Sequence, residues 1–110
     1  MFTGHEFKSW LEKQKKGRVV GVASHPGACP MAAFLREELG MDRPVVGGTT
    51  FVTHPGGEGF YLPGWARRTI ELVDAYGDGY EVTAEDVLDI LRWVVGEGYS
   101  LSEGPTEANL

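Results

Sequence analysis

Apolar side chains recur with the 3.6-residue period of a helix in four segments, which begin near residues 3, 30, 63 and 83. Thr3 with Glu6 and Thr83 with Asp86 have the spacing of a capping box, in which each side chain binds the backbone of the other residue. The other two segments begin with a proline, whose missing N–H is harmless in the first turn of a helix. The pattern therefore predicts four helices.

Short apolar runs between these segments predict strands. The run "RVVGVA" at 18–23 is rich in β-branched residues and ends at a Ser-His-Pro-Gly turn. The run "PVVGGTTFVT" at 44–53 fits either one strand with a bulge at its two glycines or two short arms around a Gly-Gly turn, and spacing does not separate these options. The run "GFYL" at 59–62 follows a glycine-rich loop, so we expect "TFVT" and "GFYL" to form a hairpin.

The order of the elements, αβαββαα, predicts a single small α+β domain with about three strands and four helices. A strand, a helix of about ten residues and a second strand are also enough for a parallel crossover, so residues 18–53 are a candidate parallel βαβ unit. We place the compact domain at residues 1–98. The remaining residues, 99–110, have the composition of a polar, flexible tail.

The composition agrees with one globular domain. A chain of 110 residues with 42% apolar content can form one core but is too short for two. The apolar runs are short and the amino terminus lacks the basic-then-apolar pattern of a signal peptide, so we expect a soluble, cytoplasmic protein without a membrane span. A single cysteine cannot form an internal disulfide, so packing must hold the fold together.

The formal net charge of −6 is unevenly distributed along the chain. Residues 1–69 contain nine basic and six acidic side chains, whereas residues 70–110 contain one basic side chain, Arg92, and ten acidic ones. Nucleic-acid binding relies on clustered Lys and Arg, so we expect no direct contact with nucleic acid. The basic cluster at 13–18 is typical of a solvated helix end.

Two similar turns contain the residues that could carry chemistry. "SHPGACPM" at 24–31 contains His25 and Cys29, and "THPGGEGF" at 53–60 contains His54. If the strands before these turns were parallel, the turns would lie side by side at one sheet edge. A thiolate beside an imidazole can act as a nucleophile, and two His with one Cys can bind a catalytic zinc. We favour two ordinary turns and a core cysteine, because no CxxC, HExxH or nucleophile-elbow pattern is present and no cofactor is implied.

The acidic carboxyl-terminal half is the stronger candidate for function. Its charge would steer a basic partner, and exposed aromatic side chains often anchor interfaces. We therefore predict a non-enzymatic module that binds a partner protein, either a basic or a nucleic-acid-binding one. Such a module could inhibit its partner or mimic a nucleic acid in the partner's binding site. The alternative is a small thiol- or zinc-dependent enzyme that uses Cys29, His25 and His54. The predicted partner-binding residues are Tyr61, Trp65, Glu71, Asp74, Asp78, Tyr80 and Glu81.

Overall fold

The helices begin where the sequence places their caps. The computed structural model describes residues 1–108, which contain the four predicted helices α1 (Gly4–Glu12), α2 (Pro30–Glu37), α3 (Gly64–Asp74) and α4 (Ala84–Gly96). The Thr83 hydroxyl accepts from the Asp86 N–H at 3.2 Å, and the Asp86 carboxylate accepts from the Thr83 N–H at 2.9 Å. The Thr3 N–H likewise donates to the Glu6 carboxylate at 3.2 Å. Within residues 1–108 no helix is long and apolar enough to cross a membrane.

The strands form two small antiparallel sheets in the described part of the chain. The first sheet pairs β1 (Val19–Val22) with β5 (Glu81–Thr83). The second has the order β2-β3-β4-β6, with bounds β2 (Val45–Val46), β3 (Thr50–Val52), β4 (Gly59–Tyr61) and β6 (Thr106–Glu107). The Gly47 N–H donates to the Thr50 carbonyl at 2.8 Å, so residues 44–53 form two arms around a turn. The hairpin of β3 and β4 is confirmed, with Phe51 opposite Phe60.

The α+β class is confirmed, but the predicted parallel unit at 18–53 is wrong. In residues 1–108, β1 and β2 belong to different sheets, and every strand pairing is antiparallel. The strand that pairs with β1 is β5, whose three residues include one apolar side chain, Val82, and therefore show no readable alternation. The expected sheet of about three strands is replaced by one sheet of two strands and one of four.

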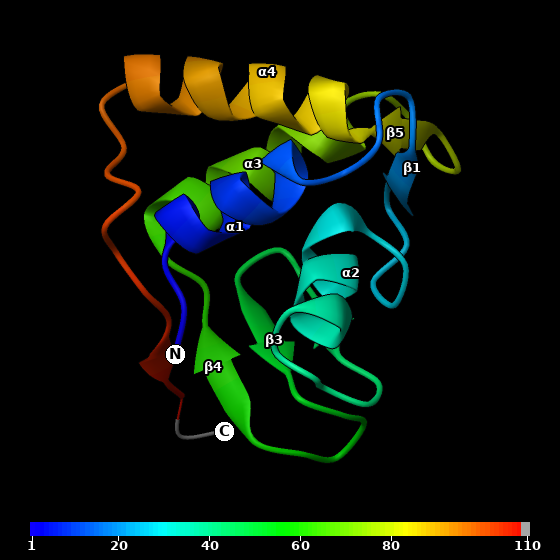
Figure 1. Cartoon of the computed structure of the whole chain (residues 1–110). Helices are drawn as coiled ribbons and strands as arrows, with labels where there is room; N and C mark the ends of the chain where they lie inside the picture. Colours follow the sequence, from blue (N-terminus) through cyan, green and yellow to red (C-terminus); the bar gives the residue numbers. More distant parts are fainter. Residues whose placement is uncertain (109–110) are drawn as a thin grey trace.

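The core is built around an aromatic cluster between the helices. Phe7 contacts the rings of Trp10, Phe34 and Trp65, with ring centroids 5.3 to 6.0 Å apart. Phe2 joins this cluster through an edge contact with Phe34 at 5.3 Å. Figure 1 shows α4 lying across one end of the molecule, with α1 and α3 beneath it and the four-stranded sheet at the opposite end. Because the core lies beneath α4, the outer face of this helix is exposed to solvent.

The carboxyl-terminal segment packs against the domain. In Figure 1 it runs from α4 back to the side of β4. Leu101 is buried and its carbonyl accepts from the Gly4 N–H at 2.7 Å, while the Trp65 ring N–H donates to the Glu103 carbonyl at 2.8 Å. The predicted boundary at residue 98 therefore does not end the packed chain. Residues 109–110 of the predicted tail lie outside the described residues.

Candidate functional site

The turn after β1 places Cys29 and His25 at one small hollow. Its volume is about 180 Å³, and both residues line it together with Ser24 and Asp74. Ser24 has a left-handed backbone (φ 64°), and its N–H donates to Asp74 Oδ1 at 2.8 Å. His25 Nε2 lies 3.2 Å from Asp78 Oδ1. The hollow thus combines a thiol with an imidazole that has an acidic neighbour.

Burial makes the thiol of Cys29 a weak nucleophile. The residue is the N-cap of α2 and is only 5% exposed. Loss of solvent raises the pKa of the Cys29 thiol, and this effect outweighs the backbone N–H groups of Ala32 and Met31, which favour the thiolate. The neighbouring Asp74 carboxylate also raises this pKa. Burial and this negative charge both disfavour the thiolate of Cys29.

His54 does not join Cys29 and His25 in a metal site. It lies on the loop between β3 and β4, where its Nδ1 is 3.1 Å from the Pro55 carbonyl oxygen. Across residues 1–108, no group of three or more His, Cys, Asp or Glu side chains is arranged to hold a metal ion. The predicted convergence of the two turns is not observed, because it depended on a parallel pairing of β1 with β2 that the fold does not contain.

Two of the predicted partner-binding residues serve the interior of the protein. Trp65 is fully buried, so it cannot be the exposed anchor that we predicted. It occupies the core face of the first turn of α3, and its N–H is bound by the Glu103 carbonyl. Asp74 is partly buried and holds the Ser24 backbone. The sequence reveals that a residue is aromatic or acidic, but not that its polar atoms already have partners.

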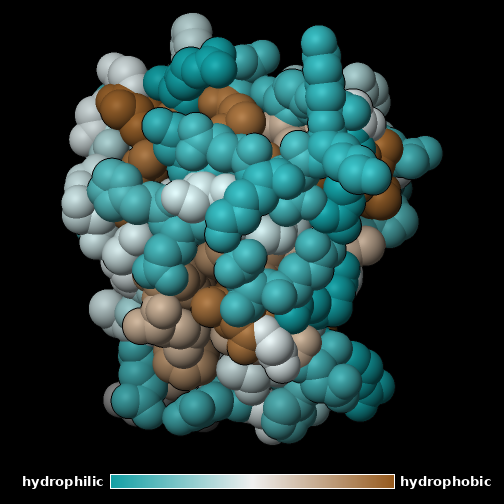
Figure 2. Space-filling model, viewed as in Figure 1, coloured by the Kyte–Doolittle hydropathy of each residue, from teal (hydrophilic) through white to brown (hydrophobic). Residues whose placement is uncertain are grey.

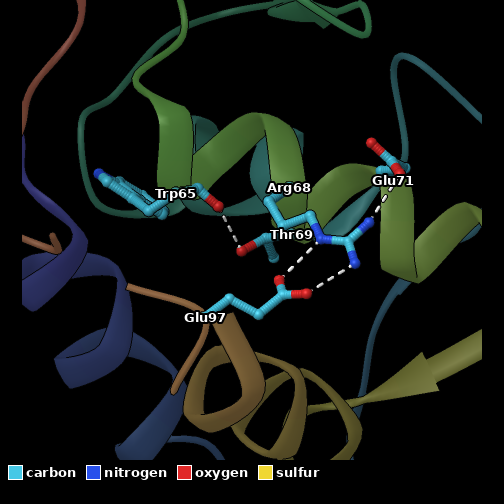
Figure 3. Close-up of polar contacts among 5 residues, drawn as sticks. All are labelled: Trp65, Arg68, Thr69, Glu71 and Glu97. Carbon is cyan, nitrogen blue, oxygen red and sulfur yellow. Dashed lines mark hydrogen bonds and ion pairs between the residues drawn. The ribbon is translucent and has the colours of Figure 1, made fainter. Parts of the chain in front are cut away.

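Glu71 also has a partner within the chain. Figure 3 shows the Arg68 side chain reaching from α3 to two carboxylates. Its Nε and second terminal nitrogen donate to the two oxygens of Glu97 at 2.8 and 2.9 Å, and the other nitrogen donates to Glu71 at 2.7 Å. The hydrogen bond from Arg68 lowers the pKa of Glu97. This cluster connects the C-terminal end of α4 to α3.

The other four predicted partner-binding residues lie at the surface. Tyr61 and Tyr80 are each 45% exposed, and Asp78 and Glu81 are exposed carboxylates. Tyr80 stacks on Tyr76, with ring centroids 4.7 Å apart and an interplanar angle of 16°. The connection between α3 and β5 therefore presents two stacked aromatic rings beside two negative charges.

A groove between α3 and α4 is the main surface feature that the sequence did not reveal. It has a volume of about 420 Å³ and is lined by Leu72, Ala75, Tyr76, Asp89, Ile90 and Trp93. Trp93 is 64% exposed, whereas Trp10 and Trp65 are buried. A second hollow of about 430 Å³ shares Asp89 and Trp93 and extends along α4 to Glu97. The sequence contains one signal for this groove: Trp93 is an aromatic residue on the polar face of the amphipathic helix α4.

Another hollow lies on the other side of α4, where Val95 is exposed. This hollow of about 330 Å³ between α1 and α4 is lined by Leu88, Leu91, Val95 and Leu101, with Lys8, Glu12 and Arg92 completing it. Figure 2, seen from the same side as Figure 1, shows apolar patches near the top of the molecule, where α4 lies, among hydrophilic side chains. Unlike the α3–α4 groove, this hollow contains no aromatic ring and has charged side chains of both signs.

Comparisons of the chain with models of protein families, with curated proteins and with solved structures found no match. The function is therefore inferred from the chemistry and placement of the residues. Two parts of the structure support a hypothesis about function: the hollow beside Cys29 and the groove between α3 and α4. The groove lies in the acidic half and combines exposed aromatic rings with a carboxylate, Asp89.

Proposed function

We propose that the protein is a non-enzymatic interaction module that binds a basic partner protein through the groove between α3 and α4. The observation that carries this proposal is the exposure of Trp93 and Tyr76 on an apolar groove. Both rings leave apolar surface in contact with water, and covering that surface would favour association. Trp and Tyr are also the residues that most often dominate the energy of protein interfaces.

The charge of this half supports a basic partner. Residues 70–110 contain ten carboxylates and one arginine. Asp74 and Asp86 bind backbone N–H groups, which leaves their negative charge uncancelled. Asp78 and Glu81 are exposed near the stacked tyrosines. A surface with this excess of negative charge attracts positively charged partners and repels acidic ones.

The position of the groove between two helices favours a helical segment as the occupant. An amphipathic helix can cover an apolar groove between α3 and α4 with its apolar side chains. Basic residues on the flanks of such a helix would face the carboxylates of α3, α4 and the connection between them. We therefore assign the groove to a basic amphipathic helix of another protein.

A pair of charge-matched variants tests this proposal. Asp78→Lys with Glu81→Lys changes the acidic half, and Glu38→Lys with Asp42→Lys makes the same change in charge on exposed positions elsewhere. Asp74 stays unchanged because it holds Ser24. Each variant is used to capture partners that are then identified by mass spectrometry. We expect the wild type and the Glu38/Asp42 variant to capture the same basic protein, and the Asp78/Glu81 variant to lose it.

Three results would overturn the proposal. The first is a captured protein that both variants retain equally, and the second is a captured protein that is acidic. The third is self-association, in which sedimentation of the purified chain shows a dimer that Trp93→Ala dissociates. The occupant of the groove would then be a second copy of this chain. Circular dichroism of each variant checks that the fold is unchanged.

A thiol-dependent enzyme is the second candidate function. It is supported by the hollow that Cys29 and His25 share, and by Asp78 beside the imidazole. The zinc version of this function has less support, because His54 does not join the site. Cys29→Ser separates the two functions: partner capture by the groove should survive this substitution, whereas any activity that depends on the thiol should disappear.

A further inference from the structure

We infer that the α3–α4 groove is a receptor for an arginine side chain of the partner, held against the rings of Trp93 and Tyr76 and paired with the carboxylate of Asp89. This inference rests on the proposed function and names the residue type that anchors the partner. All three side chains line the same hollow of about 420 Å³. Two aromatic rings with one carboxylate are the groups that recognise a cation with a flat, delocalised charge.

The aromatic groups are available to a ligand. Trp93 lies on α4 with 64% of its surface exposed, and Tyr76 follows α3 with 44% exposed. Tyr76 stacks on Tyr80, which supports the ring on one side. A guanidinium that stacks on the indole would replace contact with water by contact with a polarisable face. The aliphatic stem of the arginine would lie against Leu72 and Ile90.

The carboxylate of Asp89 is only weakly engaged by the protein itself. Arg92 donates to Asp89 Oδ1 at 2.7 Å, but both side chains of this pair are at least 70% exposed. Exposed pairs of this kind contribute little to stability and exchange readily. A carboxylate also offers two oxygens, so an incoming guanidinium can bind without displacing Arg92. The neighbouring Asp86 adds negative charge on the same side of α4.

The environment of Tyr76 is consistent with a site for a cation. Burial raises the pKa of the Tyr76 phenol, and the carboxylates of Asp86 and Asp89 raise it further. These two charges are therefore close enough to act on the ring that borders the groove. A positive group placed there would be attracted by both carboxylates, whereas a negative group would be repelled by them.

Arginine fits these surroundings better than lysine. The guanidinium is planar, stacks on aromatic rings and donates to a carboxylate through two nitrogens, whereas the ammonium of lysine is compact and strongly hydrated. The same pairing of a guanidinium with a carboxylate occurs elsewhere between α3 and α4, where Arg68 donates to both oxygens of Glu97 (Figure 3). A partner arginine would bind Asp89 through the oxygen that Arg92 does not contact.

Synthetic peptides test the inference directly. The probe is an amphipathic helix of about 16 residues with a Leu/Ala face and one central arginine, compared with peptides that carry citrulline or lysine at that position. Citrulline keeps the shape of arginine and removes its charge. Binding is followed by calorimetry and by the change in tryptophan emission, which we assign to Trp93 because Trp10 and Trp65 are buried away from the peptide. We expect the citrulline peptide to bind about tenfold more weakly and the lysine peptide about threefold more weakly than the arginine peptide.

A substitution in the groove assigns the preference to Asp89. In Asp89→Asn the arginine and citrulline peptides should bind within about twofold of each other, because the charge that distinguishes them is gone. Glu38→Gln removes one carboxylate from an exposed position on the other half of the chain and should leave the tenfold preference intact. Trp93→Leu should weaken the arginine peptide and abolish the change in emission.

The outcomes separate this inference from the proposed function. Equal binding of arginine and citrulline peptides to the wild type, an unchanged preference in Asp89→Asn, or lysine binding as tightly as arginine would each overturn the arginine anchor. If a basic partner is still lost on reversal of Asp78 and Glu81, the interaction module stands and only its anchor is wrong. If the partner is retained by that variant and no peptide binds, both proposals fail.

Discussion

Replacement of Gly21 by alanine should destabilise the protein because β1 and the start of α2 touch through their backbones. A Cβ atom on Gly21 would lie 2.4 Å from the Pro30 nitrogen and 2.6 Å from the Cys29 carbonyl carbon. Ordinary contacts of a Cβ atom begin at about 3.4 Å, so β1 and α2 would have to separate by about 1 Å. Neither atom belongs to a side chain that can rotate away.

The expected loss is about 2 kcal/mol in the free energy of unfolding. Forcing one extra methyl group into a packed interior costs about 1–3 kcal/mol, and a clash with backbone belongs at the upper end. Alanine also restricts the unfolded chain, which stabilises the folded protein by about 0.4–1 kcal/mol and offsets part of this loss. A domain of this size has a total stability of about 5–15 kcal/mol, so the change is a substantial part of the whole.

Urea unfolding followed by circular dichroism and tryptophan emission measures this loss. Gly27→Ala is the matched control, because a Cβ atom at Gly27 would meet nothing within 4 Å and its backbone is outside the left-handed region. We expect the control to remain within about 0.5 kcal/mol of the wild type. If Gly21→Ala were as harmless as Gly27→Ala, the close approach of β1 to α2 would be refuted.

Three further substitutions or treatments test other contacts. Cys29 should react with iodoacetamide about 100-fold more slowly than a free thiol near pH 8, because burial disfavours its thiolate and covers it, and urea should restore the reaction. Trp65→Phe removes the bond to the Glu103 carbonyl and should cost about 1–2 kcal/mol in urea unfolding, with faster hydrogen exchange in residues 101–108. Arg18 lowers the pKa of Glu37, so their pairing stabilises the fold above the unfolded pKa of Glu37 and is lost as the pH falls through its folded pKa. Arg18→Met should therefore reduce the loss of stability between about pH 6 and pH 3, by less than about 1 kcal/mol because both side chains are about 40% exposed.

Each of these expectations has a clear contrary result. Rapid alkylation of native Cys29 would mean that its thiol is open to solvent and would favour the thiol enzyme. Unchanged hydrogen exchange in Trp65→Phe would mean that the carboxyl-terminal segment is held without that bond. An identical pH dependence in Arg18→Met and wild type would mean that the Arg18–Glu37 pair adds nothing to folding.

Local signals in the sequence predicted the helices and the hairpin well. The capping box at Thr83 and Asp86 and the proline at the start of α2 act within a few residues, so their effects can be read directly from spacing. The partner of β1 could not be read in this way. Its pairing with β5 joins residues about 60 positions apart in the chain, and β5 and β6 are too short to show a period.

The exposure of the candidate partner-binding residues was predicted only in part, for a related reason. Charge and aromatic content pointed to the carboxyl-terminal half, and Tyr80, Asp78 and Glu81 are indeed at its surface. The helical period puts Trp65 on the same face of α3 as Thr69 and Val73, which is the buried face. Spacing could not tell that the Trp93 ring borders a groove, because that depends on how α3 packs against α4. Burial and hydrogen-bond partners arise from tertiary packing, which a single sequence does not display.

The carboxyl-terminal segment also has a consequence for how the protein is made. Until β6 is synthesised, β4 has no neighbour on its outer side, so a nascent chain carries an open strand edge formed by Phe60 and Tyr61. Open edges of this kind pair with other chains, and β6 covers this one. A chain that ends at residue 104 should therefore aggregate during refolding, as light scattering would register, while the full chain stays monodisperse. In the described residues, β6 thus leaves a strand of only two polar residues, Thr106 and Glu107, at this edge of the sheet.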